Sequence, residues 1–152
     1  MRKKEKEIKD TDILIEILHN EQVFRIGFND HPYPYIIPLN FVYDSDHIFF
    51  HCAKRGRKID LIKKDGHVCF EIDKQISIQS SDVACEWGTR FQSIIGTGFA
   101  VIIKNKPDKM KALNLLMKKY SGSSDWEFMK KGVNNVNIVR IDIREMEGKE
   151  SV

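Results

Sequence analysis

The fold is decided by the stretch YIIPLNFVYDSDHIFFHC, residues 35–52. Two runs of β-branched and aromatic residues, 35–43 and 47–52, flank the Asp-Ser-Asp segment 44–46, which is typical of a tight hairpin turn. Alternate residues of a strand face opposite ways, and both sets in the first run are largely apolar, so we expect both of its faces to be covered. Pro38 has no N–H for a ladder hydrogen bond, which predicts a sheet edge or a bulge.

Other segments of the chain continue this pattern. The apolar runs follow one another mostly directly, at spacings suited to hairpins, whereas a doubly wound parallel sheet needs a helix between most strands. The sequence therefore predicts a mainly β fold, an antiparallel sheet or small barrel with helices packed outside. The further strands expected are 22–29, 67–73, 91–103 and 137–144, and the helices are 10–20, 58–64 and 107–120.

Local patterns support several of these elements. Asp10 or Thr11 can cap the first helix. In strand 67–73 apolar and polar residues alternate, and the inward side chains expected are Val68, Phe70 and Ile72. Residues 74–84 are polar and poorly patterned. The last helix carries a stripe formed by Met110, Leu113, Met117 and Tyr120, and Gly122 follows its end.

Length and composition indicate one globular domain, residues 1–152. The chain is 41% hydrophobic with a net charge of +3, and its mixed acids and bases are not typical of a dedicated nucleic-acid binder. No apolar run approaches the roughly 20 residues of a membrane span, and the first residues lack a signal-peptide pattern, so we expect no membrane partner. Three scattered cysteines favour a reducing compartment, which predicts a cytoplasmic location.

A basic segment, AKRGRK at 53–58, stands between two apolar elements. It is expected at the start of a helix, where the first amides have no partner within the helix and readily bind phosphate. Gly56 lets the backbone approach an anion closely, and Arg57 and Lys58 add positive charge. The alternative is a solvated cationic loop, and the segment alone does not decide between the two.

Familiar motifs of metal and covalent chemistry are missing from the sequence. The cysteines and histidines lack zinc-site spacing, so no metal is expected, and no base is placed beside a cysteine. Gly96 and Gly98 lie inside a predicted strand with no helix after it, which excludes a dinucleotide fingerprint.

The stretch CEWGTRFQSIIGTG, residues 85–98, is richer in polar groups than a core strand requires. A surface position explains Arg90. Together with Thr89 and Ser93 it could also bind hydroxyl groups or a phosphate. From these residues both interpretations stay open.

Four stretches in this order resemble one family: PYIIPLNFVY, FFHCAKRGRKIDLI, VCFEID and CEWGTRFQSIIGTG. They are similar to the nitroimidazole-resistance-type (NimA-like) branch of the pyridoxamine 5'-phosphate oxidase-like flavoproteins, over nearly the whole chain. Two patterns are fairly specific, F-H-x-A-x-x-G-x-K and W-x-T-R-[FY]-x-S. The first is met by Phe50, His51, Ala53, Gly56 and Lys58, and the second by Trp87, Thr89, Arg90, Phe91 and Ser93.

The resemblance implies a six-stranded antiparallel split barrel that binds FMN at the interface of a homodimer. It implies that the basic segment holds the phosphate, that the backbone at 38–40 lines the isoalloxazine ring, and that His51 lies near the reacting position as a catalytic candidate. Further polar contacts would come from the 89–93 region of either subunit. The implied cofactor-binding residues are Pro38, Leu39, Asn40, His51, Ala53, Arg57, Lys58, Thr89, Arg90 and Ser93.

The implied function is that of an FMN-dependent oxidoreductase that reduces a small electron-poor acceptor such as a nitroimidazole, which would link it to antibiotic resistance. A flavin- or haem-binding module without turnover is the alternative, and a nucleic-acid binder a weaker one. The resemblance also implies that pyridoxamine phosphate oxidase activity itself is not expected. Those enzymes grip their substrate with a C-terminal Arg- and Trp-containing segment, which IDIREMEGKESV at 141–152 does not match. Family membership alone does not fix a reaction.

Overall fold

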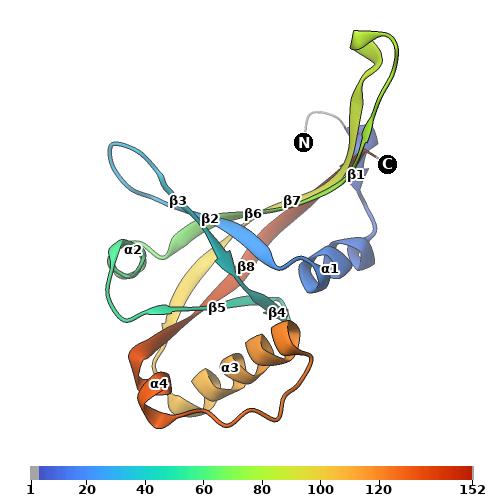
Figure 1. Ribbon diagram of the computed structural model, residues 1–152. Coiled ribbons are helices and arrows are strands. Elements are labelled where there is room, and N and C mark those ends of the chain that lie inside the picture. The colour runs from blue at the N-terminus through green and yellow to red at the C-terminus, as the bar shows by residue number, and fades with distance from the viewer. Residues whose placement is uncertain (1–3, 152) are drawn as a thin grey trace.

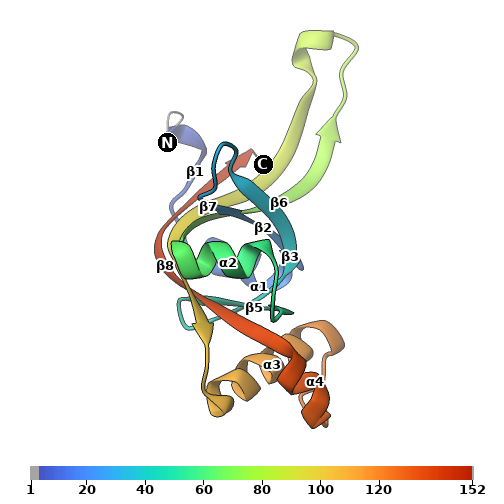
Figure 2. The same ribbon diagram turned by 90° about the vertical axis from the view of Figure 1, so that its left-hand side faces the viewer.

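The sheet begins and ends on one bent strand, which closes it into a barrel (Figure 1). The computed structural model describes residues 4–151, and its strands run in the order β3-β2-β6-β7-β8-β5-β4, with β1 added beside β8. Every pairing is antiparallel, and the helices lie outside the barrel (Figures 1 and 2). The strands are β1 (Glu7–Ile8), β2 (Val23–Phe28), β3 (Tyr35–Asn40), β4 (Val42–Asp44), β5 (His47–Ala53), β6 (His67–Gln79), β7 (Gly88–Ile103) and β8 (Val136–Ser151). The helices are α1 (Thr11–Asn20), α2 (Arg57–Lys64), α3 (Lys106–Ser121) and α4 (Lys130–Asn135), with 3₁₀ turns at Lys4–Lys6 and Ala84–Glu86.

The change of partner at Phe41 closes the barrel. β3 pairs with β2, β4 pairs with β5, and Phe41 alone separates β3 from β4. The predicted strand 35–43 is therefore one extended segment that leaves one neighbour for another halfway along. Because β3 pairs with β2 only, Pro38 lies on an edge strand, as its missing N–H predicted.

The hydroxyl group of Tyr120, near the end of α3, binds the backbone at this change of partner. Its oxygen accepts a hydrogen bond from the Phe41 N–H at 2.9 Å. It also lies within donating distance of two carbonyl oxygens, 2.6 Å from that of Gln22 and 2.9 Å from that of Phe41. Phe41 is fully buried and lies where the sheet ladder is interrupted. Without Tyr120, its backbone N–H and C=O groups would therefore lack hydrogen-bond partners.

Lys119, the preceding residue, ties the same point to α1. Its ammonium group donates to the carbonyl oxygens of Leu18 at 3.2 Å and Glu21 at 2.6 Å, and it lies 3.8 Å from the centroid of the Phe41 ring. Burial lowers the pKa of Lys119 to about 8, and the Glu21 carboxylate opposes that shift only in part. The end of α3 thus holds α1, β2 and the bent strand together.

Two apolar cores lie on opposite sides of the barrel wall. The larger fills the barrel and is closed by α1, with fully buried Phe24, Phe50 and Phe70 among its members. The smaller lies outside, where α3 covers the outer faces of β4, β5 and β8; it contains Val42, Phe49, Ala112, Leu116 and Ile138. α3 is therefore attached to the outer wall by its own hydrophobic contacts.

Most predicted elements are confirmed, including the mainly β split-barrel class. Asp10 caps α1, with its side chain accepting from the Asp12 N–H at 2.9 Å, and Gly122 ends α3 in the left-handed conformation at φ 76°. The predicted alternation of β6 is observed, with Val68, Phe70 and Ile72 buried. The six predicted strands all exist; the structure divides the 35–43 strand in two and adds β1.

A long projecting hairpin was missed. β6 continues to Gln79 and β7 begins at Gly88, so the polar segment that followed the predicted strand 67–73 is paired rather than irregular. This arm, residues 74–92, extends away from the barrel at the end opposite α3 and α4 (Figures 1 and 2). Its apolar side chains Ile76, Ile78, Val83 and Trp87 are exposed, and Trp87 is 56% accessible. With no core on either face of the arm, its sequence carries no inside–outside alternation to read.

Within residues 4–151, no helix is both long and apolar enough to cross a membrane.

Replacing Tyr120 with Phe removes the hydroxyl group and leaves the buried Phe41 N–H without its partner. We expect the free energy of unfolding to fall by about 1–3 kcal/mol, the cost of an unsatisfied buried backbone group. Urea denaturation measures the change. Tyr33→Phe is the matched control, because Tyr33 is 77% exposed, and it should shift stability by no more than about 0.5 kcal/mol. Equal effects from the two variants would contradict the role given to Tyr120.

The depressed pKa of Lys119 predicts a pH dependence of stability. Between about pH 8 and the ordinary lysine value of 10.5, the unfolded chain binds the Lys119 proton more fully than the folded chain does. The contribution of Lys119 to the free energy of unfolding therefore increases as pH rises from about 8 to 10.5. Measured by urea denaturation, the stability difference between wild type and Lys119→Met should move in favour of the wild type from pH 8 to 10.5. A constant difference would exclude a depressed pKa.

Candidate functional site

The basic segment forms the turn from β5 into α2, as the sequence predicted. Gly56 precedes the helix with φ 127°, a conformation that favours glycine, and an added Cβ would meet no atom within 4 Å. α1 and α3 begin with side-chain caps from Asp10 and Asn105, but no side chain caps α2. The first N–H groups of α2 therefore have no side-chain acceptor, and exposed cations flank them in the chain, which makes this a suitable place for a phosphate group.

The two cations that follow Gly56 have different surroundings. The Arg57 guanidinium binds Asp30 at 2.8 and 2.7 Å and lies 4.5 Å from the centroid of the Tyr35 ring. Its hydrogen bond to Asp30 lowers the pKa of that carboxyl group. Arg57 thus holds the 29–34 turn against α2. Because Asp30 uses some of the guanidinium N–H groups, only the remaining ones can bind an anion.

Lys58 is half-buried and has no hydrogen-bond or ion-pair partner within residues 4–151. Its charge acts on Cys52 of β5: burial raises the pKa of that thiol, and Lys58 lowers it by a smaller amount. Lys58 is therefore the cation of this segment placed closest to the barrel wall, and its ammonium group is available to a ligand.

His51 and Asn40 meet in the wall of one cavity. The cavity has a volume of about 510 Å³ and lies where β3 and β5 meet α3, the following loop and α4. Along β5, Ala53 is on the same face as His51 and about 7 Å away, so this face leads from the cavity to the basic segment. Within the described chain the His51 imidazole makes no hydrogen bond or ion pair.

The far wall of this cavity was only partly foreseen. The predicted stripe along 107–120 is present, and its members Leu113, Met117 and Tyr120 line the cavity. Glu127, Phe128 and Met129 from the loop and Val133 from α4 complete the wall, and no sequence pattern had assigned them. α4 has six residues, no side-chain cap and one buried residue, which is too little periodicity to recognise.

The remaining predicted site residues divide into two groups. Pro38 and Leu39 precede Asn40 on β3, with Leu39 facing the core, so their contribution to a ligand is through backbone atoms and the Pro38 ring. Thr89, Arg90 and Ser93 lie on β7 in and beside the arm, paired with Ile78, Ser77 and Asp73. The arm and the α3–α4 end are at opposite ends of the molecule (Figures 1 and 2). Within one chain the structure does not bring Thr89 and Arg90 to His51.

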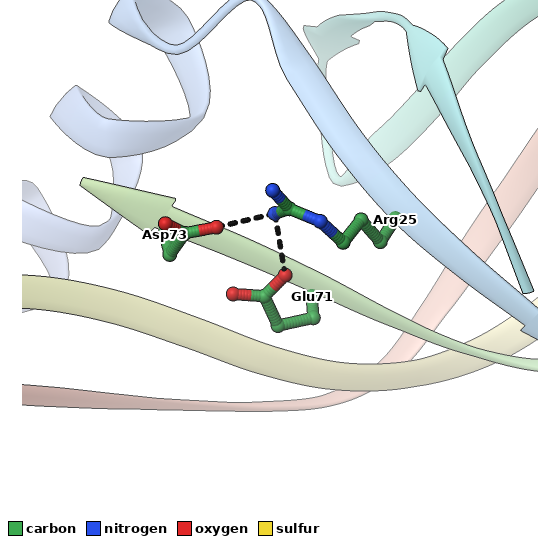
Figure 3. Close-up of polar contacts among 3 residues, drawn as sticks. All are labelled: Arg25, Glu71 and Asp73. Carbon is green, nitrogen blue, oxygen red and sulfur yellow. Dashed lines mark hydrogen bonds and ion pairs between the residues drawn. The ribbon is translucent and has the colours of Figure 1, made fainter. Parts of the chain in front are cut away.

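A charge cluster on the outer face of the sheet was not predicted. Figure 3 shows Arg25 of β2 reaching two carboxylates of β6, Glu71 at 3.0 Å and Asp73. Burial raises the pKa of Glu71, with the nearby Asp73 charge acting in the same direction and Arg25 opposing both. Arg25 is paired in register with Pro38, so this cluster borders the strand predicted to line the flavin ring. The residues 4–151 contain no group of three or more His, Cys, Asp or Glu that could hold a metal ion.

The sequence profile of the pyridoxamine 5'-phosphate oxidase family matches residues 10–150, nearly the full chain. The protein belongs to this family. The match covers all four sequence stretches that carried the resemblance. No curated protein matches the chain by sequence.

Solved structures share the fold of this family member at low sequence identity. A candidate 5-nitroimidazole antibiotic resistance protein from Bacteroides thetaiotaomicron has a TM-score of 0.83 at 23% identity, covering 95% of this chain and 86% of its own. The flavocytochrome Anf3 from Azotobacter vinelandii has 0.87 at 16%, covering 100% and 72%. A FAD and heme binding protein from Mycobacterium smegmatis has 0.86 at 13%, covering 96% and 73%.

Proposed function

We propose that this protein binds FMN and passes electrons from a reductant to a small, electron-poor acceptor such as a nitroimidazole. One observation carries the proposal. The face of β5 that holds His51 and Ala53 runs from a 510 Å³ cavity toward the uncapped, cationic start of α2. Phosphate recognition at one end and an apolar space at the other suit a flavin mononucleotide with room for an acceptor. Family membership and the flavin-binding structural relatives support the flavin.

The residues of this chain fit the cofactor in separate roles. The α2 amides and Lys58 would bind the phosphate, and the edge strand at Pro38, Leu39 and Asn40 offers backbone groups to the ring. Because the sequence has one compact cationic cluster at a helix start and no second nucleotide fingerprint, we propose FMN rather than FAD. Bound FMN would supply the redox chemistry itself. The chain then has to orient an acceptor and exclude water, which the apolar cavity wall can do.

His51 is the proposed catalytic residue. It lines the cavity, has no partner within residues 4–151, and has a side chain suited to donate a proton near neutral pH. This placement supports a role toward the acceptor more than a purely phosphate-binding role, since the phosphate cradle begins farther along β5.

We further propose a homodimer in which the arm of one subunit completes the site of the other. The outer face of β2, β3, β6 and β7 exposes Ile36 (64%), which lines a hollow of about 570 Å³, and Ile95 (62%), which lines a neighbouring hollow. Apolar side chains left open on both this face and the arm favour contact with a second copy. A two-fold arrangement could carry Thr89 and Arg90 to the partner's His51, which one chain alone does not allow.

A haem-binding module is the second candidate function. Two structural relatives are named for haem as well as flavin, and His51 in an apolar cavity is a residue type that ligates haem iron. The visible spectrum of the purified protein distinguishes the two, because flavin and haem absorb in different bands. A haem spectrum without flavin would overturn the oxidoreductase proposal.

Lys58→Ala should weaken FMN binding by about 1–3 kcal/mol, because it removes a charge-assisted hydrogen bond to the phosphate. Binding of riboflavin, which has no phosphate, should not change. Fluorescence titration of the apoprotein measures both. Lys63→Ala, in the last turn of the same helix, is the charge-matched control. Equal affinity of the wild type for FMN and riboflavin would exclude a phosphate site here.

Mixed dimers test whether the arm crosses to the partner. If it does, a dimer of one Lys58→Ala subunit and one Arg90→Ala subunit has one intact site and one doubly altered site. Titration of co-expressed, separately tagged subunits should then show half of the sites with wild-type FMN affinity. Two equally weakened classes of site, or a monomer mass by light scattering with FMN bound, would contradict the proposed assembly.

His51→Ala should retain FMN and slow electron transfer to the acceptor. Anaerobically reduced wild-type protein should be reoxidised quickly by a nitroimidazole. If His51 supplies a proton, reoxidation of the variant should be slower by about 10²-fold or more. Stopped-flow absorbance follows the reaction. If neither form reacts, the nitroreductase proposal fails; if the variant only loses FMN affinity, His51 belongs to cofactor binding.

A further inference from the structure

The 510 Å³ cavity has few polar lining residues, and the rest of its wall is apolar. Four of its lining residues among those described are polar: Asn40, His51, Tyr120 and Glu127. The rest are aliphatic, thioether or aromatic, apart from Gly132, and include Leu113, Met117, Phe128, Met129 and Val133. Such a wall binds a ligand by apolar contact, and the few polar groups decide which ligand fits.

Two of the hydrogen-bond donors at this wall are already used by the fold. The Asn40 amide donates to the Gln22 carbonyl oxygen at 3.2 Å, which directs its own Oδ1 elsewhere. The Tyr120 proton serves the Gln22 or Phe41 carbonyl oxygen, and one of its lone pairs accepts from the Phe41 N–H. Tyr120 can then offer a ligand only a lone pair, whereas Asn40 keeps its Oδ1 acceptor and a second amide N–H.

Glu127 adds a full negative charge to this set. Among the described residues lining the cavity it is the one with a formal charge at neutral pH, and its carboxylate has no hydrogen-bond or ion-pair partner within residues 4–151. A carboxylate only accepts. Glu127 is itself exposed, and the equally exposed Lys130 and Lys131 beside it do not line the cavity.

We propose that this cavity selects a planar aromatic cation, with Glu127 as the residue that determines this specificity. The negative charge of Glu127 and the acceptor atoms of Asn40 and Tyr120 favour a ligand that donates hydrogen bonds or is positively charged. The Phe128 ring and the thioethers of Met117 and Met129 also favour a flat cation. A cavity of about 150 Å³ holds one benzene ring, so about 510 Å³ has room for a planar ligand beside the flavin ring. The inference rests on the proposed function where it names the acceptor class, but binding itself needs no electron transfer.

Calorimetry with three redox-inert probes of one size tests the selection: 1-methylquinolinium, 1-methylnaphthalene and 1-naphthoate. The cation should bind the protein with its cofactor at least tenfold more tightly than the neutral probe, and the anion most weakly. Glu127→Gln keeps the shape and removes the charge; it should weaken the cation by about threefold to tenfold and leave the neutral probe unchanged.

Asp125→Asn is the matched control, because it removes the same charge from the same loop at a residue that does not line the cavity. It should change none of the affinities by more than about twofold. Methyl NMR locates the probe: the Met117 and Met129 signals should shift on binding, while Met146 on β8, outside this cavity, should not.

Equal affinity for all three probes, equal losses in Glu127→Gln and Asp125→Asn, or shifts confined to Met146 would each overturn the proposal. Its failure is distinguishable from that of the proposed function. A protein that binds FMN and reacts with nitroimidazole but shows no charge selection refutes the inference alone. A protein without flavin that still selects the cation refutes the proposed function alone.

Discussion

The contact between the Tyr120 hydroxyl group and the Phe41 backbone is the constraint on which the arrangement of the rest depends. A strand that changes partners must break its ladder, and the broken point here is buried, so a side chain has to replace the missing strand. Because Tyr120 comes from α3, barrel closure and the position of that helix are one event. Asn40 immediately precedes the break, so the same contact sets how β3 presents its last residue to the cavity.

The division of the site residues follows from barrel geometry. Outward-facing positions on β3 and β5 are adjacent across the closure, which brings Asn40 to His51, while the arm grows from the far ends of β6 and β7. The two ends lie on opposite sides of the molecule, so a single chain does not bring them together (Figures 1 and 2). The family resemblance assigned all of these residues to one site, but only some of them lie close together in the monomer.

The sequence predicted what alternation and caps encode. Val68, Phe70 and Ile72 on β6, Asp10 at the start of α1 and Gly122 at the end of α3 each have a local physical signature. The arm lacks one, because neither of its faces packs on a core. The Arg57–Asp30 pair and the Arg25–Glu71–Asp73 cluster join residues far apart in the chain, and charges on separate elements carry no mark of their partners. The sequence showed Tyr120 as part of an apolar stripe. It did not show the role of the Tyr120 hydroxyl group, because the three hydrogen-bond partners of that group are backbone atoms.

The residues proposed to bind the flavin and those proposed to bind the acceptor are held in place by different interactions, so they differ in how freely they can be substituted. The groups on β3 and β5 are fixed by backbone ladders and by the main core, so substitutions near them disturb closure of the barrel. α3 presents Ala112 and Leu116 to its small core, and Leu113, Leu116 and Met117 line the cavity. The loop that carries Glu127 and Met129 has few such packing constraints, so its side chains can change with little cost in stability. If the family keeps one cofactor and changes its acceptor, we expect this loop to vary first. The residues that determine acceptor specificity would then lie in the segment with the weakest sequence pattern.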